Sequence, residues 1–216
     1  MQHHLPITKT ARYFTSQAPG AHIKQVWVVV HGYGQLAEFF LRKFHPLFAD
    51  EVLVVAPEGL HRYYREGYSG RVGASWMTKE DRLSDIADYV GFLNDLHSHI
   101  AAQVGEAQWR VVGFSQGAAT AARWLSQTQA DIHQFIVWAG AFPNDVNLET
   151  GRERLNAMDM QVVIGTRDQF ITEDHILKAE SWFDAHNLTC TFHRFDGDHD
   201  IPPQVLSELH AKWVRP

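Results

Sequence analysis

The chain has 216 residues, 45% of them hydrophobic, and a formal net charge of -6 at pH 7. This length and apolar content suit one well-buried core, so we expect a single domain over residues 1–216. The 19 Lys and Arg residues are scattered along the sequence, which argues against a nucleic-acid partner.

Apolar runs typical of strands alternate with amphipathic stretches typical of helices. We expect strands at residues 26–30, 52–56, 110–114, 135–139, 162–165 and 189–195. We expect helices at residues 36–48, 81–103, 116–126, 172–185 and 204–213. This alternation predicts an α/β fold with a mostly parallel central sheet and helices on both faces.

Two stretches lie outside the alternation. Residues 58–78 are rich in Gly, Tyr and Arg and show no clear period, so we expect a long loop between a strand and a helix. Long ordered loops of this kind usually have a function. Residues 143–160 are polar and follow the end of a strand. Neither stretch suggests a linker that would divide the chain.

A candidate nucleophile stands where the strand at 110–114 meets the helix at 116–126. The sequence there reads Gly113-Phe114-Ser115-Gln116-Gly117. A sharp turn between strand and helix presents its serine above the sheet edge, and glycines on either side let the backbone pass closely. The backbone N–H of Gln116, at the start of the helix, is free to face an anion on the substrate.

A second glycine turn follows the first buried strand. It reads His31-Gly32-Tyr33-Gly34 and leads into the helix at 36–48. We assign the backbone N–H groups of Tyr33 and Gln116 as an oxyanion hole, each worth on the order of 3 kcal/mol of activation free energy. The alternative reading is a glycine turn that leads into the helix, and the two readings are compatible.

The expected acid is Asp168, which follows the buried strand at 162–165. A serine nucleophile on this type of sheet is followed in the chain first by an acid and then by a histidine. The alternative reading of Asp168 is a helix cap, but Thr172 already fits that position. Asp145, Asp196 and Asp198 are the rival carboxylates.

The expected base is His199, in the loop between the strand at 189–195 and the last helix. His193 is its nearest rival but lies within the strand. The alternating Asp196, Asp198 and Asp200 suggest a calcium loop only weakly, because Ile201 stands where such a loop needs glycine. We therefore expect no metal site.

These motifs together resemble the α/β-hydrolase superfamily, and within it the phospholipase/carboxylesterase family that includes acyl-protein thioesterases. The resemblance covers nearly the whole chain, and Trp76 is similar to an aromatic residue that the family has ahead of its central helix. It implies an α/β-hydrolase fold with no large lid domain. It also implies a serine hydrolase without cofactor that cleaves carboxylic esters through Ser115, His199 and Asp168 and an acyl-enzyme intermediate.

The sequence also departs from the thioesterase members of that family. The segment after Gly34 lacks their acidic and glycine residues, and the segment before Asp168 lacks their His-Gly pair. These departures favour simple ester hydrolysis. Thioesterase or lysophospholipase activity with the same triad is the alternative, followed by a peptidase or a binding protein without catalysis.

The loop at 58–78 is the expected wall of the substrate pocket. Its candidate lining residues are Tyr63, Tyr64, Tyr68, Trp76 and Met77, and its arginines could hold a carboxylate or phosphate. The equally plausible alternative is a loop packed on itself. With no room for a large lid domain, we expect small, soluble esters of short acyl chains as substrates.

The single cysteine, Cys190, excludes an intramolecular disulfide and favours a reducing compartment. The sequence has no stretch as long as a membrane span and no N-terminal run suited to a signal peptide. We therefore expect a cytoplasmic protein, and a homodimer is left open.

Overall fold

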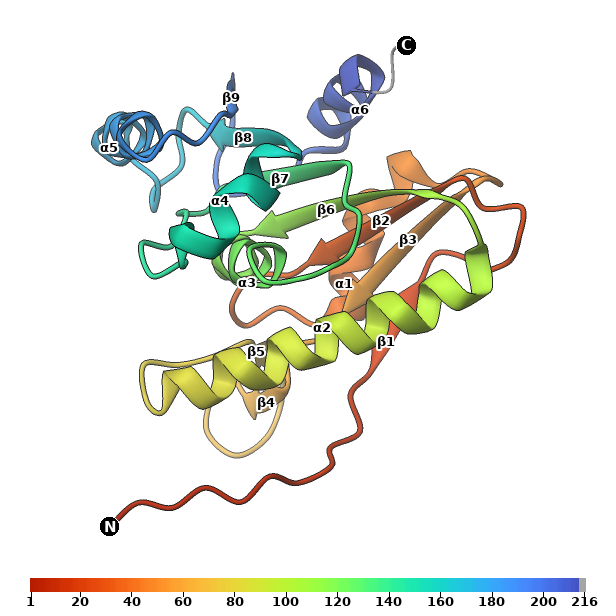
Figure 1. Cartoon of the computed structure of the whole chain (residues 1–216), viewed down its shortest axis with the longest axis vertical. Helices are drawn as coiled ribbons and strands as arrows, with labels where there is room; N and C mark the ends of the chain where they lie inside the picture. Colours follow the sequence, from red (N-terminus) through yellow and green to blue (C-terminus); the bar gives the residue numbers. More distant parts are fainter. Residues whose placement is uncertain (214–216) are drawn as a thin grey trace.

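The computed structural model describes residues 1–213, and its centre is a seven-stranded sheet in the order β1-β3-β2-β6-β7-β8-β9 (Figure 1). All neighbouring strands are parallel except β1, which pairs antiparallel with β3 at one edge. The strands of this sheet are β1 Tyr13–Thr15, β2 Gln25–Val30, β3 Val52–Pro57, β6 Gln108–Phe114, β7 Gln134–Trp138, β8 Asp159–Gly165 and β9 Thr191–Phe195.

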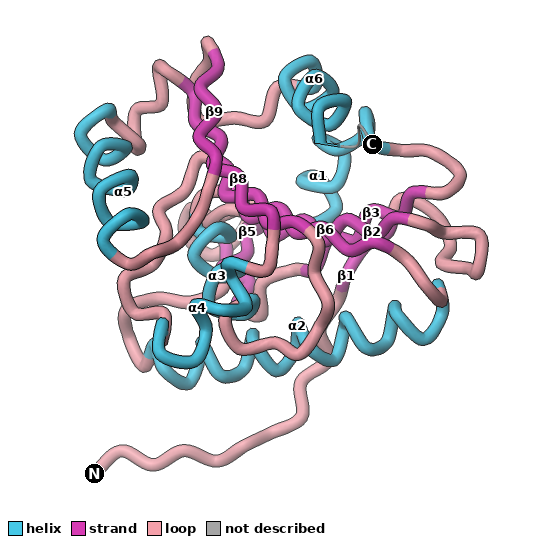
Figure 2. The backbone as a smooth tube through the Cα atoms, turned by 45° about the horizontal axis from the view of Figure 1, so that its top comes forward, coloured by secondary structure: helices cyan, strands magenta, loops and turns pink. Residues whose placement is uncertain are grey.

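The helices cover both faces of the sheet (Figure 2). One face packs against α2 (Arg82–Val104), α3 (Gln116–Leu125), α4 (Leu148–Asn156) and α5 (Glu173–Ala185). The other packs against α1 (Ala37–Leu41), the 3-10 helix η1 (Arg42–Leu47) and α6 (Pro203–Trp213). The mostly parallel sheet between two helical layers confirms the fold class predicted from the sequence. Among the described residues, no helix is both long and apolar enough to cross a membrane.

Each predicted strand and helix is present with small differences at its ends. The predicted helix at 36–48 divides into α1 and η1, and Pro46, which lacks a backbone N–H, lies within η1. The polar stretch 143–160 contains α4, whose Asn147 side chain caps the N–H of Glu149 at 3.0 Å. Tertiary contacts stabilise α4 despite its weak apolar stripe, since Leu155 is fully buried.

The expectation of one long loop at 58–78 was wrong in part. A hairpin of β4 (His61–Tyr64) and β5 (Val72–Ser75) stands there, apart from the main sheet. Gly73 packs closely against the turn after β2. A Cβ on Gly73 would stand only 2.7 Å from the Gly34 carbonyl oxygen. The hairpin is therefore docked on the turn that we expect to form the oxyanion hole.

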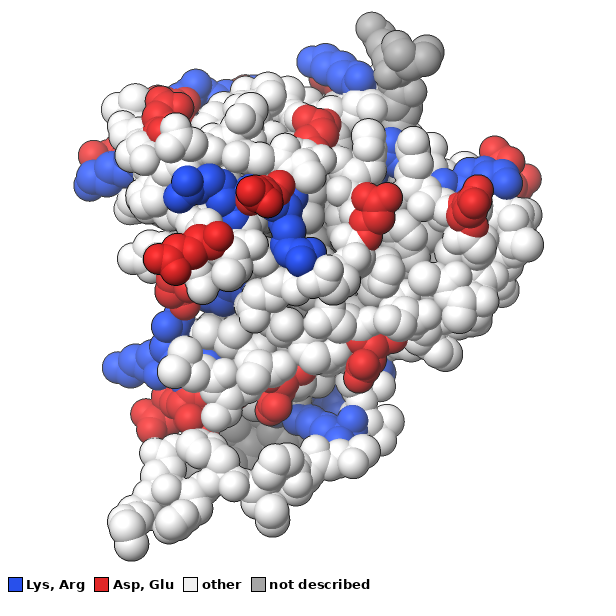
Figure 3. Space-filling view, in the orientation of Figure 1, with Lys and Arg blue, Asp and Glu red and all other residues white. Residues whose placement is uncertain are grey.

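Acidic and basic side chains alternate over the face seen in Figure 3, without a large area of one sign. Most of the arginines within residues 1–213 pair with carboxylates.

Candidate active site

The predicted site residues all follow the carboxyl ends of parallel strands. The turn at residues 31–34 follows β2, Ser115 follows β6, Asp168 comes after β8, and His199 comes after β9. Because the carboxyl ends of parallel strands meet at one edge of a sheet, these loops lie at the same edge. The topology thus gathers residues that are far apart in the sequence.

Ser115 stands at a strained turn between β6 and α3. Its backbone has φ +55° and ψ −117°, a conformation that costs a non-glycine residue about 1–3 kcal/mol. The Ser115 N–H donates to the Trp138 carbonyl at 3.0 Å. A Cβ on Gly117 would stand 2.1 Å from the carbonyl oxygen of Val30, so only glycine fits beside the neighbouring strand. This packing holds the serine out of the sheet.

Asp168 and His199 are joined by a hydrogen bond. His199 Nδ1 donates to Asp168 Oδ2 at 2.7 Å, and the Asp168 side chain is 0% exposed. The second carboxylate oxygen accepts the backbone N–H groups of Phe170 at 2.8 Å and Ile171 at 3.0 Å. Three donors from the protein thus hold the two oxygens of this buried carboxylate, which orients the imidazole with its Nε2 free for chemistry.

Two aromatic rings hold the imidazole of His199 from its sides. Phe114, the residue before Ser115, has its ring centroid 4.9 Å from the imidazole centroid. Phe170 packs edge-on at 4.8 Å, and 16% of the His199 side chain remains exposed. The imidazole therefore lies beside the Ser115 turn and still reaches solvent.

The rival carboxylates are engaged elsewhere. Asp145 pairs with Arg82 at 2.5 Å and with Arg123 at 2.9 Å. Asp196 and Asp198 both pair with Arg167. These contacts keep all of them from orienting His199.

The remaining alternatives are also placed away from the imidazole. His193 Nε2 lies 2.5 Å from the Gln161 side-chain oxygen, and the His193 ring packs against Trp213 of α6. Asp200 pairs with Lys43, whereas Asp196 and Asp198 pair with Arg167, so the three aspartates of the supposed calcium loop diverge.

The turn after β2 is held by the buried side chain of His31. Its Nδ1 donates to the Gly32 carbonyl at 2.8 Å, and its Nε2 accepts the Gly59 N–H at 2.9 Å. Burial lowers the pKa of His31 to about 4, so the ring is neutral at physiological pH and can act as donor and acceptor at once. The indole N–H of Trp76 donates to the His31 carbonyl at 2.9 Å.

Two backbone N–H groups remain open at the expected oxyanion site. Within residues 1–213, the N–H groups of Tyr33 and Gln116 donate to no other protein atom. The Gln116 side chain meanwhile accepts the Trp76 N–H at 3.2 Å and donates to the Met77 carbonyl at 2.8 Å. This side chain ties the start of α3 to the loop after β5.

The structure does not bring the predicted pocket residues together. Trp76 is fully buried and packs on His31, so it supports the turn and does not line an open pocket. Tyr68 is 97% exposed at the hairpin tip and Tyr64 is half exposed. Tyr63 stacks on Tyr33 at 5.4 Å, and Met77 receives a contact from Arg123 at 3.7 Å. Of these residues, Tyr63 and Trp76 pack against the turn at 31–34.

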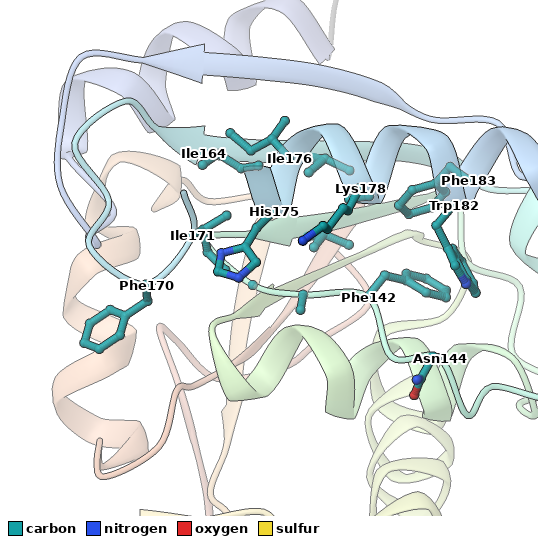
Figure 4. Close-up of a pocket in the computed structure, with 15 residues that line it drawn as sticks. Phe142, Asn144, Ile164, Phe170, Ile171, His175, Ile176, Lys178, Trp182 and Phe183 are labelled. Atoms are coloured by element: carbon teal, nitrogen blue, oxygen red, sulfur yellow. The ribbon is translucent and has the colours of Figure 1, made fainter. Parts of the chain in front are cut away.

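An apolar cavity of about 350 Å³ opens beside the site instead, between α5 and the ends of β7 and β8 (Figure 4). Its walls include Phe142, Phe170, Ile171, Trp182 and Phe183. Gly140 also lines it, and a Cβ on this glycine would stand 2.7 Å from the Ser115 carbonyl oxygen. The apolar cavity therefore begins next to Ser115.

A second cavity of about 530 Å³ lies beside the turn after β2. It is lined by Gly34, Leu36, Phe39, Lys43, Arg65 and Arg71, and we name it the cationic cavity.

The sequence interpretation missed three side chains that shape the site: those of His31, Gln116 and Phe170. A polar residue directly after an all-apolar strand was the available signal for His31. Nothing in the sequence predicted the packing of Phe170 on His199.

The family model described as Serine hydrolase (FSH1) matches residues 23–208. No curated protein matches the chain in sequence.

Solved structures share its fold at low sequence identity. The acyl-protein thioesterase 2 of Zea mays is 16% identical with a TM-score of 0.70, over 95% of this chain and 98% of that one. A phospholipase/carboxylesterase of Dyadobacter fermentans is 18% identical with a TM-score of 0.64, over 94% and 97%. The carboxylesterase of Bacillus cereus is 15% identical with a TM-score of 0.67, over 94% and 93%. The expected α/β-hydrolase fold is thus confirmed.

Proposed function

Because the chain belongs to the serine hydrolase (FSH1) family, we propose that it hydrolyses carboxylic esters of small acyl groups through Ser115, His199 and Asp168. The observation that carries the proposal is the 2.7 Å hydrogen bond between His199 and the buried Asp168, at the sheet edge where Ser115 stands in its strained turn.

The reaction proceeds in two steps. Ser115 Oγ attacks the ester carbonyl carbon while His199 Nε2 takes the proton of the serine hydroxyl. The oxyanion of the tetrahedral intermediate accepts hydrogen bonds from the backbone N–H groups of Tyr33 and Gln116. His199 then gives the proton to the alcohol oxygen as the C–O bond breaks. Water, activated by the same imidazole, releases the acid and restores Ser115. Asp168 keeps Nδ1 protonated throughout. No step requires a cofactor.

The apolar cavity is the place for the acyl group. It adjoins Ser115 through Gly140, and its walls are the side chains of Phe142, Ile171 and Trp182. Its volume of about 350 Å³ is at the small end of typical ligand pockets, which favours short acyl chains.

Thioester hydrolysis is the second candidate, because the same attack and oxyanion stabilisation act on a thioester. The structural likeness to the acyl-protein thioesterase of Zea mays favours it. Parallel assays with an oxygen ester and a thioester of the same acyl group separate the two.

A cytoplasmic location also stays a prediction, resting on the single cysteine.

Labelling with a fluorophosphonate tests the proposal. The wild-type protein should carry the adduct on Ser115, identified by peptide mass, and should turn over p-nitrophenyl butyrate. Ser115→Ala should lose both, with turnover falling about 10⁴-fold or more. Ser98→Ala, on the exposed side of α2, is the matched control. An unlabelled wild type, or a Ser115→Ala variant with full turnover, overturns the nucleophile assignment.

A further inference from the structure

Two arginines face each other near the tip of the β4–β5 hairpin. The Arg65 N–H donates to the Arg71 carbonyl at 2.8 Å, one pair beyond Tyr64 and Val72 in the register of the hairpin. Residues opposite each other in an antiparallel pair place their side chains on the same face, and like charges there are destabilising. An arrangement with this cost calls for an anion that offsets it.

No such anion comes from the described part of the protein. Within residues 1–213, neither Arg65 nor Arg71 pairs with a carboxylate. Arg62 on the same hairpin, by contrast, pairs with the buried Glu58 at 3.3 Å. Two unpaired guanidinium groups thus stand together on a chain whose other arginines mostly have partners.

Both arginines line the cationic cavity, and this cavity adjoins the expected oxyanion site. Arg65 Nε lies 3.9 Å from the position that a Cβ would occupy on Gly34, so its guanidinium packs on the turn that carries the Tyr33 N–H. A ligand whose carbonyl oxygen enters the oxyanion hole therefore lies within reach of this positive charge.

The cavity extends toward the histidine side of the site. Lys43 lines it, and its ammonium group pairs with Asp200 at 2.5 Å, next in sequence to His199. The carboxylate of Asp200 neutralises Lys43, so the uncompensated charge is that of the arginines. Since His199 gives its proton to the leaving alcohol, a cavity that extends toward His199 can hold the alcohol part of the ester.

We infer that Arg65 and Arg71 bind an anionic group, a carboxylate or a phosphate, on the alcohol part of the ester. The planar guanidinium donates two parallel hydrogen bonds to either group. Leu36 and Phe39 supply an apolar wall for the carbon skeleton that joins this group to the ester oxygen. This inference rests on the proposed ester hydrolysis and narrows its substrate to esters of acidic alcohols.

The test uses three butyrate esters that differ only at the far end of the alcohol: phenyl butyrate, 4-butyryloxybenzoate and 4-butyryloxyphenyl phosphate. The measured quantity is the ratio of kcat/KM for each anionic ester to kcat/KM for phenyl butyrate. Comparing this ratio between variants cancels the intrinsic reactivity of the esters. Arg65→Gln and Arg71→Gln should each lower it about tenfold, as expected for the loss of one charge-assisted bond.

Arg152→Gln on the exposed surface of α4 is the matched control, since it removes the same charge far from the cavity. A lowered ratio with the benzoate, the phosphate or both supports the inference and tells which anion is preferred. A ratio that neither arginine affects overturns it, while Ser115 labelling and phenyl butyrate turnover would leave the proposed function standing. A fourth ester, phenyl succinate, has its charge on the acyl part. If Arg65→Gln and Arg71→Gln lower kcat/KM for phenyl succinate more than for the two esters of acidic alcohols, the placement of the anion on the alcohol is overturned. Absent labelling and turnover would overturn both.

Discussion

His199 Nδ1 lies 2.7 Å from Oδ2 of Asp168, and the partner carboxylate is completely buried. Two backbone N–H groups hold its other oxygen, so the carboxylate is held in place whether or not a substrate is bound. This arrangement fixes both the ring orientation and the tautomer that general-base catalysis by Nε2 requires.

Asp168→Asn should leave the fold intact and lower kcat for p-nitrophenyl butyrate by about 10⁴-fold, because an amide in place of the carboxylate favours the wrong imidazole tautomer. Steady-state kinetics and circular dichroism measure the two effects. Asp196→Asn is the matched control, since Asp196 is exposed and pairs with Arg167. Equal losses in both variants would refute the assignment of the acid.

His199→Ala should abolish measurable ester turnover, whereas His193→Ala should retain it. The His193 imidazole is bonded to Gln161 within the sheet and does not reach the Ser115 turn. The measured quantity is kcat/KM of the two variants for p-nitrophenyl butyrate. Thermal unfolding checks that both variants are folded and similarly stable. A silent His199→Ala and an inactive His193→Ala would reverse the assignment of the base.

Ala179→Leu should shift the preferred acyl chain of p-nitrophenyl esters toward acetate. Ala179 lines the apolar cavity from α5, and the larger side chain reduces the space for an acyl group. The readout is the ratio of kcat/KM for hexanoate to that for acetate. Ala185→Leu makes the same change at an exposed position of the same helix and should leave the ratio as it is. Equal ratios in all three proteins would place the acyl group elsewhere.

The stability of the protein should fall as the pH drops from about 6.5 to about 4 because of His31. Burial lowers its pKa in the folded protein from 6.5 to about 4, so between these values the unfolded chain binds a proton that the folded protein does not. The stability that the neutral His31 contributes is fully present above pH 6.5, and roughly 3 kcal/mol of it is lost by pH 4.

Urea unfolding at pH 7.5 and pH 4.5 measures this effect. In His31→Gln the pH dependence should be much weaker, whatever the absolute stability of the variant. His97→Gln, whose imidazole is only partly buried, should remove less of it. An unchanged pH dependence in His31→Gln would show that other groups cause it.

Two glycine substitutions should change stability in opposite directions. Gly117→Ala should destabilise the protein, because its Cβ would stand 2.1 Å from the Val30 carbonyl oxygen. Gly91→Ala on the exposed side of α2 meets nothing within 4 Å and should add about 0.5–1 kcal/mol of unfolding free energy. Urea midpoints measure both, and a neutral Gly117→Ala would mean that α3 can move away from β2.

The sequence predicted the elements whose side chains are apolar and periodic. The central strands such as β3 are fully buried, and an all-apolar run is a clear signal for them. It did not predict β1, which is three residues long and half buried, or α4, whose outer surface is polar. Both depend on contacts with the rest of the protein, which local patterns do not contain.

For the candidate site, strand ends and chain order were enough to bring Asp168 and His199 together, and the two are hydrogen-bonded in the structure. Their catalytic roles stay predictions. The pocket was beyond reach, because an aromatic residue in a loop can pack inward, as Trp76 does, or outward, as Tyr68 does. The facing of Arg65 and Arg71 likewise depends on hairpin register, which became visible only with the structure.

The hairpin tip between Arg65 and Arg71 makes few packing contacts with the rest of the molecule. Gly67 and Gly70 have open space around them, and Tyr68 is nearly fully exposed. Residues at the base of the hairpin, such as Gly73, are fixed against the oxyanion turn. Insertions, deletions and changes of charge at the tip can therefore alter which substrates bind during evolution, while the residues at the base of the hairpin and in the oxyanion turn stay in place.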